Sequence, residues 1–332
     1  MSNFSVPDIL SFTRLSRSIA DIKSRADTTR TEAVTGRYED LTAQLKGDVG
    51  SAHLLQKAIN DAKSYGSLLS QAELRAQMTQ SVLDSASSSA NGIGPAAFSA
   101  FSTGDETQLK TISTQARGAL TSLFSDLNTT LGGRTLFAGD APDGPALTAP
   151  DLFFADMNAI FASAADAADL EAQLDAYFDD PAGGFETNIY AGGDGETPNV
   201  ELSPGVRVDI SAKANSTEIK ALMRGLAELA FYDSATYGDA QDIGQAGAER
   251  VMRAEVDLTA LRAGIGVNEA RIAAAKDRYA NEEVVLGKLY NEKTARDPYE
   301  AASELQLLES QLEASYLLSV RLGNLSLTNF MR

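Results

Sequence analysis

Residues 251–289 form the longest periodic segment of the chain. Twelve of their positions follow one another at alternating gaps of three and four residues, and only Asn268 and Glu282 among them are polar. This heptad spacing predicts a long helix that packs along a partner helix as in a coiled coil. A polar residue inside such a seam can fix the register of the pair, and we assign that role to Asn268. The seam consists of Val251, Ala254, Leu258, Leu261, Ile265, Asn268, Ile272, Ala275, Tyr279, Glu282, Leu286 and Leu289.

Helical spacing recurs on both sides of this segment. The further predicted helices cover residues 6–45, 51–90, 105–131, 216–232 and 298–329. The last of them is predicted to begin at Asp297, because an Asp can cap a helix, Pro298 suits the first helical position and Glu300 completes a capping box. The chain is therefore predicted to be mainly α-helical, with long antiparallel helices or coiled coils formed by its N- and C-terminal segments.

The middle of the chain has a different character. Glycine and proline are frequent after residue 131, and the short runs RTLFAGD, ETNIYAGG and VELSPGVRVDISA are typical of strands and turns. An Ala-rich stretch at 151–178 predicts one or two short helices. We therefore expect a small α+β insert and a division into three parts. These are the terminal helices (1–45 and 296–332), a helical bundle (46–139 and 215–295) and the insert (140–214).

The C-terminal tail, YLLSVRLGNLSLTNFMR, is apolar on every face of a helix. Such a helix must be buried on all sides, and the tail is too short and too rich in Ser and Asn to span a membrane. We interpret it as a helix made for assembly with other chains. The predicted assembly and chaperone interface comprises Ile9, Phe12, Ile19, Leu305, Leu308, Leu312, Leu322 and Leu325.

Composition argues against several classes of function. The net charge is −18 and no predicted helix carries a basic block, so nucleic acid is not an expected partner. The chain has no cysteine and one histidine, His53, and it contains neither a phosphate-binding loop nor a nucleophile elbow. We expect no enzymatic activity, no cofactor and no metal. The N-terminal segment is interrupted by charges and does not resemble a cleavable secretory signal.

Several segments resemble the flagellin family, and within it the branch that joins the hook to the filament. The similar segments are 35–37 (TGR), 131–139 (LGGRTLFAG), 265–272 (IGVNEARI), 312–315 (LEAS) and 325–327 (LSL), the last two inside 305–331. The resemblance covers about 1–139 and 200–332, and the insert matches less well. One departure is that no proline-containing turn follows Arg37.

The resemblance implies a structural subunit of the bacterial flagellum, exported through the flagellar type III apparatus without a cleaved signal. It implies an extracellular ring of copies between the hook-associated protein FlgK and flagellin, and an export chaperone of the FlgN type. The alternative inside the family is flagellin itself. From another class, an exported coiled-coil adhesin or a stalked enzyme would also carry heptads, but it would not carry both terminal matches.

Overall fold

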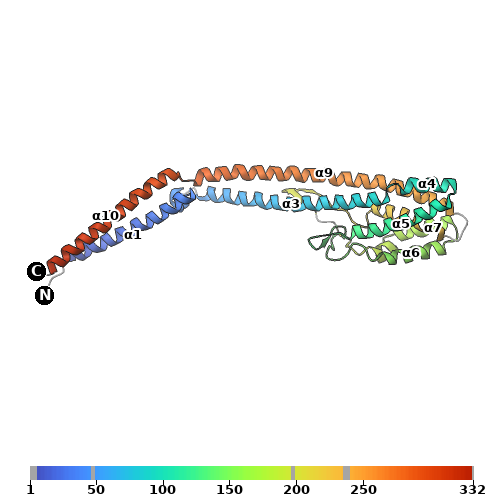
Figure 1. Ribbon diagram of the computed structural model, residues 1–332, viewed down its shortest axis with the longest axis horizontal. Coiled ribbons are helices and arrows are strands. Elements are labelled where there is room, and N and C mark those ends of the chain that lie inside the picture. The colour runs from blue at the N-terminus through green and yellow to red at the C-terminus, as the bar shows by residue number, and fades with distance from the viewer. Residues whose placement is uncertain (1–5, 46–48, 196–198, 235–239, 331–332) are drawn as a thin grey trace. The chain divides into compact units, whose positions relative to one another are not determined.

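The computed structural model describes residues 6–45, 49–195, 199–234 and 240–330, and it describes side chains for 13–45, 49–195, 199–234 and 241–322. The long helices are α1 (Val6–Thr35), α3 (Val49–Ala90), α5 (Glu106–Leu127), α9 (Ala240–Thr294) and α10 (Pro298–Phe330). The shorter ones are α2 (Leu41–Gln44), α4 (Ile93–Thr103), α6 (Pro150–Ser163), α7 (Ala167–Phe178) and α8 (Thr217–Phe231). A π-helix (Phe185–Ile189) and a 3-10 turn (Tyr232–Ser234) complete them (Figure 1). The prediction of a mainly helical chain with a small mixed insert is confirmed.

Two compact units divide the chain. The terminal unit comprises Met1–Ser64 and Ala280–Arg332, and the central unit comprises Tyr65–Tyr279. The predicted three-part division separates the insert from the bundle, and it stays a prediction.

In the terminal unit α1 and α10 lie side by side (Figure 1). They run antiparallel, because the end of α1 meets the beginning of α10. The pair buries Ala26 and Thr29 of α1 against Ala301 and Leu308 of α10. As predicted, Asp297 caps α10, accepting a hydrogen bond from the Tyr299 amide at 2.8 Å.

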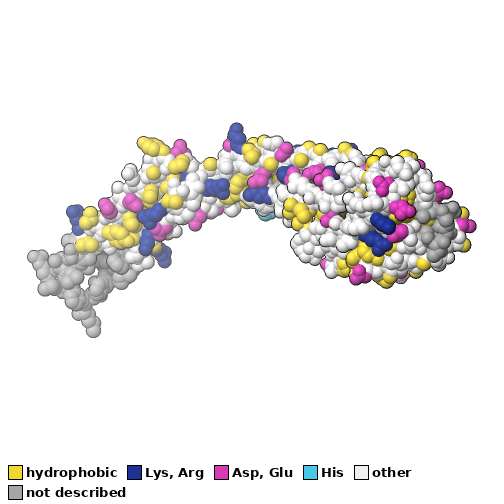
Figure 2. Space-filling model, turned by 45° about the vertical axis from the view of Figure 1, so that its right-hand side comes forward, with side chains coloured by type: hydrophobic (Ala, Val, Ile, Leu, Met, Phe, Trp, Pro, Cys, Tyr) yellow, Lys and Arg dark blue, Asp and Glu magenta, His cyan; other side chains and the backbone are white. Residues whose placement is uncertain are grey.

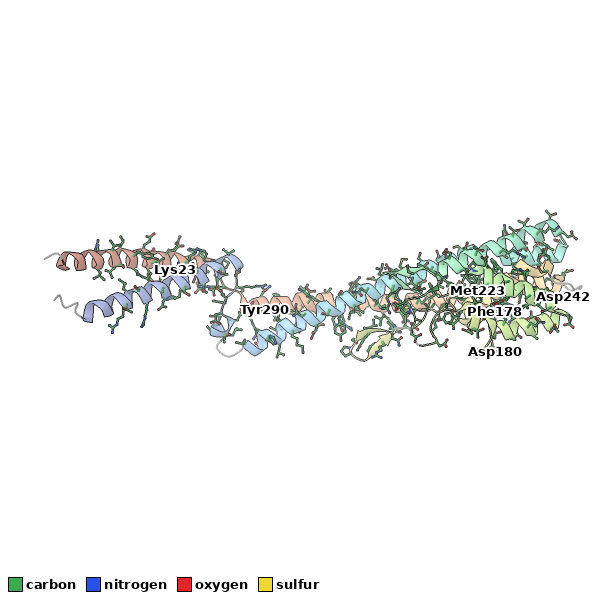
Figure 3. All side chains as sticks on the ribbon, turned by 90° about the horizontal axis from the view of Figure 1, so that it is seen from below. Lys23, Phe178, Asp180, Met223, Asp242 and Tyr290 are labelled. Carbon is green, nitrogen blue, oxygen red and sulfur yellow. The ribbon has the colours of Figure 1, made fainter. Side chains whose placement is uncertain are left out.

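The turn after α1 explains one of the sequence motifs. Gly36 has a φ of 66°, a left-handed conformation that glycine adopts without strain, and it ends α1. Arg37 then donates a hydrogen bond to Asn291 on α9 at 2.9 Å. The Arg37 guanidinium lies over the ring of Tyr290, 5.8 Å from its centroid (Figure 3 labels Tyr290). The TGR segment therefore ties the end of α1 to the end of α9.

In the central unit the heptad seam of α9 faces α3. Seam residues from Val251 to Tyr279 are mostly buried. Gln80 of α3 donates a hydrogen bond to the Arg262 carbonyl at 2.6 Å, and Glu73 of α3 forms an ion pair with Lys276. Asn268 does not contact α3 through a hydrogen bond; its amide donates to the Asp209 carbonyl at 2.6 Å. This residue thus anchors the chain that follows strand β4 (Val206–Val208) rather than fixing the register of α9 on α3.

The insert is built around aromatic side chains. Phe153, Phe161, Phe178 and Phe185 are fully buried between Phe124 of α5 and Phe231 of α8. Figure 3 labels Phe178 and the neighbouring Met223 in this core. These rings form the apolar core of the insert, since burial of each aromatic side chain removes about 150–250 Å² of surface from water.

Two small antiparallel hairpins supply the strands among the described residues. Strand β1 (Thr130–Leu131) pairs with β2 (Arg134–Thr135), and β3 (Val200–Ser203) pairs with β4 (Val206–Val208) through a bulge at Glu201/Ser203. The third strand-like run, ETNIYAGG, was predicted wrongly, because it falls on the π-helix (Phe185–Ile189). Phe185 and Ile189, the first and last residues of this helical turn, are both buried. Within this run, the one residue that pairs as a strand would is Tyr190, which forms an isolated β-bridge with Leu147.

A buried ion cluster joins α7 to α8 and α9. Arg224 is 5% exposed and donates to Glu171 at 2.5 Å, Asp175 at 2.6 Å and Glu228 at 3.2 Å. Arg250 donates to Glu171 and Glu228, each at 3.1 Å. Burial raises the pKa of Glu228, and the two arginines oppose that rise. The cluster holds α7 in place by charge as well as by apolar contact.

Candidate assembly surface

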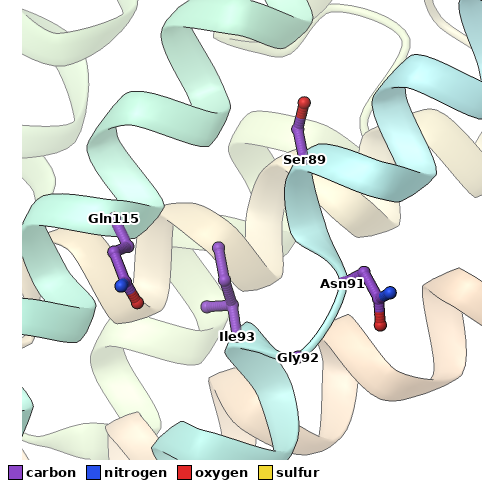
Figure 4. Close-up of a pocket in the computed structure, with 5 residues that line it drawn as sticks. All are labelled: Ser89, Asn91, Gly92, Ile93 and Gln115. Carbon is purple, nitrogen blue, oxygen red and sulfur yellow. The ribbon is translucent and has the colours of Figure 1, made fainter.

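A pocket of about 460 Å³ between α3, α4 and α5 is lined by neutral side chains, Ser89, Asn91, Gly92, Ile93 and Gln115 (Figure 4). It holds no acid, base or paired nucleophile. His53 is exposed, and no group of three potential metal ligands occurs in the described part of the chain.

The predicted interface residues differ in burial. Ile9, Phe12 and Leu325 lie in α1 and α10, outside the residues whose side chains are described. Ile19, Leu305 and Leu312 are half-buried, Leu308 is 1% exposed and Leu322 is 40% exposed. Leu308 therefore packs inside the pair of α1 and α10, so part of the predicted strip stabilises the chain itself. Its role in assembly stays a prediction.

Several apolar side chains around α10 are exposed in the part of the terminal unit whose side chains are described. They are between 49% and 65% exposed: Leu307, Tyr316, Leu317, Leu318 and Val320. Figure 2 shows hydrophobic side chains at the surface along this pair of helices. Scattered apolar residues are ordinary on a protein surface, but a continuous patch marks an interaction site. No described helix is long and apolar enough to cross a membrane.

A second apolar stripe runs along α9 inside the central unit. Its residues recur at gaps of three and four, carry no charge and are all exposed: Val256, Ala260, Ala263, Val267, Ala270 and Ala274. At 100° per residue, this spacing places the stripe on the face of α9 opposite the seam that packs on α3. The sequence contains this stripe as a second apolar series with gaps of three and four, offset by half a helical turn from the seam. The seam is longer and has larger side chains, so the second series is easily overlooked. Small side chains let another helix approach α9 closely.

One end of this stripe is hollowed. An open depression of about 460 Å³ is lined by Glu249, Met252, Arg253, Val256 and Asp257. Glu255 is not part of this lining, and it has a buried oxygen that finds no hydrogen-bond partner among the described residues. Burial raises the pKa of Glu255, because its charged form is poorly solvated there.

Charge is divided unequally between the two units. The terminal unit contains 14 basic and 16 acidic residues, whereas the central unit contains 14 basic and 30 acidic residues. The excess is concentrated in 135–206, which has 14 acidic residues and neither Lys nor Arg. Copies of the chain can therefore pack through the nearly neutral terminal unit with little repulsion, whereas like-charged inserts repel one another.

Comparison with known proteins gives a fold but no close relative. No protein-family model matches the chain, and no curated protein matches it by sequence. Among solved structures it is similar to a "putative flagellar hook-associated protein" from Vibrio parahaemolyticus, with a TM-score of 0.52 and 13% identity. The similarity covers 73% of this chain and 95% of that one. A second similar structure is Bacillus cereus FlgL, with a TM-score of 0.40, 16% identity and the same two coverages.

At this level of identity the likeness concerns the fold alone. The resemblance predicted from the sequence is confirmed to that extent. The chain has the fold of the Vibrio parahaemolyticus hook-associated protein, and it presents exposed apolar side chains on two of its long helices.

Proposed function

We propose that the protein is a structural subunit of the bacterial flagellum that assembles with other copies of itself through α9 and α10. The observation that carries the proposal is the apolar stripe on α9, which lies opposite the seam that α3 already covers. A helix whose second apolar face stays exposed within its own chain has that face left for another chain. The fold shared with a hook-associated protein supports the flagellar setting.

Within the flagellum, we propose the position between hook and filament. The C-terminal ending LSLTNFMR favours a junction protein, because flagellins more often finish in a short LL-R-type ending. The partners would be copies of the same chain in a ring, FlgK on one side and flagellin on the other. The filament subunit itself is the second candidate, supported by the same fold and the same terminal segments.

This position implies a route out of the cell. We propose export through the flagellar type III apparatus without a cleaved signal, with a FlgN-type chaperone covering the apolar face of α10 before export. The exposed residues Leu317, Leu318 and Val320 are the surface that such a chaperone would protect from water. The terminal helices, the bundle and the insert would then act as three parts of the assembled subunit.

Deletion of the gene tests the proposal and separates its two candidates. If the protein joins hook and filament, cells lacking it should build hooks without filaments and release unassembled flagellin into the medium. If it is flagellin, the same cells should lack filaments and release none. Normal filaments on the deletion strain would contradict both candidates.

A further inference from the structure

Arg296 occupies the short link between α9 and α10 and is almost fully buried, with 8% of its surface exposed. Its guanidinium forms ion pairs with Glu32 on α1 and with Glu304 on α10. Glu32 is 5% exposed. We call Glu32, Arg296 and Glu304 the clasp, because one buried cation bridges both helices of the terminal pair.

The clasp lies where two links of the backbone meet. The Arg296 amide donates a hydrogen bond to the Gly36 carbonyl at 2.9 Å, and the Tyr38 amide donates to the Thr294 carbonyl at 3.2 Å. Between them, Arg37 and Ala295 form an antiparallel bridge. The link after α1 and the link before α10 therefore run together as a short ladder.

Two side chains of the clasp also contact the link that follows α1. Glu32 accepts a hydrogen bond from the Glu39 amide at 2.9 Å, and the Arg296 guanidinium lies over the ring of Tyr38, 5.4 Å from its centroid. A shift of α1 along α10 would separate Glu32 from Arg296 and leave both charges buried. Removing one partner of a buried ion pair is strongly unfavourable, even where the intact pair adds little stability.

Other contacts between α1 and α10 specify their alignment weakly. Besides Glu32, the buried residues among the described side chains of the pair are Ala26, Thr29, Ala301 and Leu308, of which only Leu308 is large. The ion pairs Arg25–Glu304 at 3.2 Å and Arg30–Glu309 at 3.1 Å are exposed on at least one side. Small side chains fit neighbours in several alignments, and exposed ion pairs contribute little.

We propose that the clasp sets the axial register of α1 against α10, as a buried polar group sets register in coiled coils. Without it, the two helices pair in more than one alignment, displaced by about one helical turn of 5.4 Å. This inference concerns the isolated chain and does not rest on the proposed function.

Spin labels test it, because the chain has no cysteine of its own. Ser24 on α1 and Ser310 on α10 are exposed and can be changed to Cys and labelled. Dipolar distance measurement on the full chain should give one narrow peak for the parent protein. Arg296→Met should replace it with a broad or double distribution.

Two further variants separate register from stability. In Glu32→Leu with Arg296→Met, both charges are gone, so thermal stability should return toward the parent value while the distribution stays broad. Glu309→Gln, which removes only an exposed pair, should keep the narrow peak. A narrow parent-like peak in Arg296→Met or in the double variant would overturn the proposal, as would equal broadening in Glu309→Gln.

Discussion

Tyr65 of α3 and Tyr279 of α9 stack face to face, with ring centroids 4.9 Å apart and planes 5° from parallel. Tyr279 is a seam residue and is 8% exposed, so the stack lies on the side of α9 that the heptad spacing assigned to a partner helix. The stack shows that α3 covers the seam of α9 within the chain, whereas the stripe on the opposite face of α9 stays exposed.

Replacing Tyr279 by Ala should lower the free energy of unfolding by about 3 kcal/mol, because the change leaves a cavity and ends the stacking. Urea unfolding followed by circular dichroism measures the loss. Tyr316→Ala is the matched control, since Tyr316 is 49% exposed on α10. Equal losses in the two variants would mean that the stack adds nothing to the packing of α3 on α9.

A charge placed on the open stripe should block assembly without disturbing the fold. Val267 is 56% exposed, so Val267→Glu should change the free energy of unfolding by less than about 0.5 kcal/mol. In cells that carry only this variant, the share of filament-bearing hooks should fall sharply in electron micrographs. Val206→Glu, at a site 52% exposed at the start of strand β4, is the control and should leave filaments intact. Normal filaments with Val267→Glu would remove the stripe from the assembly surface.

Glu255 should make stability depend on pH in a defined direction. Its pKa is raised in the folded chain, so the folded state binds the proton more tightly than the unfolded state does. Its contribution is therefore neutral in acid and becomes unfavourable as pH rises above about 4.3, the ordinary value for Glu. Glu255→Gln should stabilise the isolated chain at pH 7 but not at pH 3. Thermal unfolding at the two pH values measures this, and a stabilisation that is the same at both would contradict it.

The ion cluster around Arg224 should be sensitive to loss of a single member. Arg224→Met leaves Glu228 buried with one cation fewer, and the free energy of unfolding should fall by about 3–5 kcal/mol. Arg253 pairs with Glu249 at 3.5 Å, and both side chains are largely exposed. Arg253→Met should therefore cost less than about 1 kcal/mol. Chemical denaturation of the two variants measures both changes in the free energy of unfolding. A small loss of stability in Arg224→Met would show that aromatic packing alone holds α7.

The long helices could be predicted from the sequence because their signals are local. The seam at 251–289, the cap at Asp297 and the hairpin in VELSPGVRVDISA each depend on residues close together in the chain, and the structure contains all three elements. The end of the first predicted helix was less accurate, since α1 stops at Thr35 and only the short α2 follows. There, Gly36 ends the helix before the periodic pattern does.

The parts that sequence reasoning missed depend on contacts between distant segments. Arg224 meets Glu171 and Asp175 across about fifty residues, and Arg296 meets Glu32 from the other end of the chain. Nothing in the spacing of these residues marks them as partners. Likewise, Leu308 and Leu317 look alike in the sequence of α10, and only the packing of α1 makes one of them buried and the other 65% exposed.

The absence of Lys and Arg from 135–206 has a practical consequence. Trypsin cuts after these two residues, so even the fully unfolded chain offers it no cleavage site between Arg134 and Arg207. A complete digest leaves residues 135–207, which include the four buried phenylalanines of the insert, as one long acidic peptide, and any covalent change within these residues shifts the mass of that single fragment.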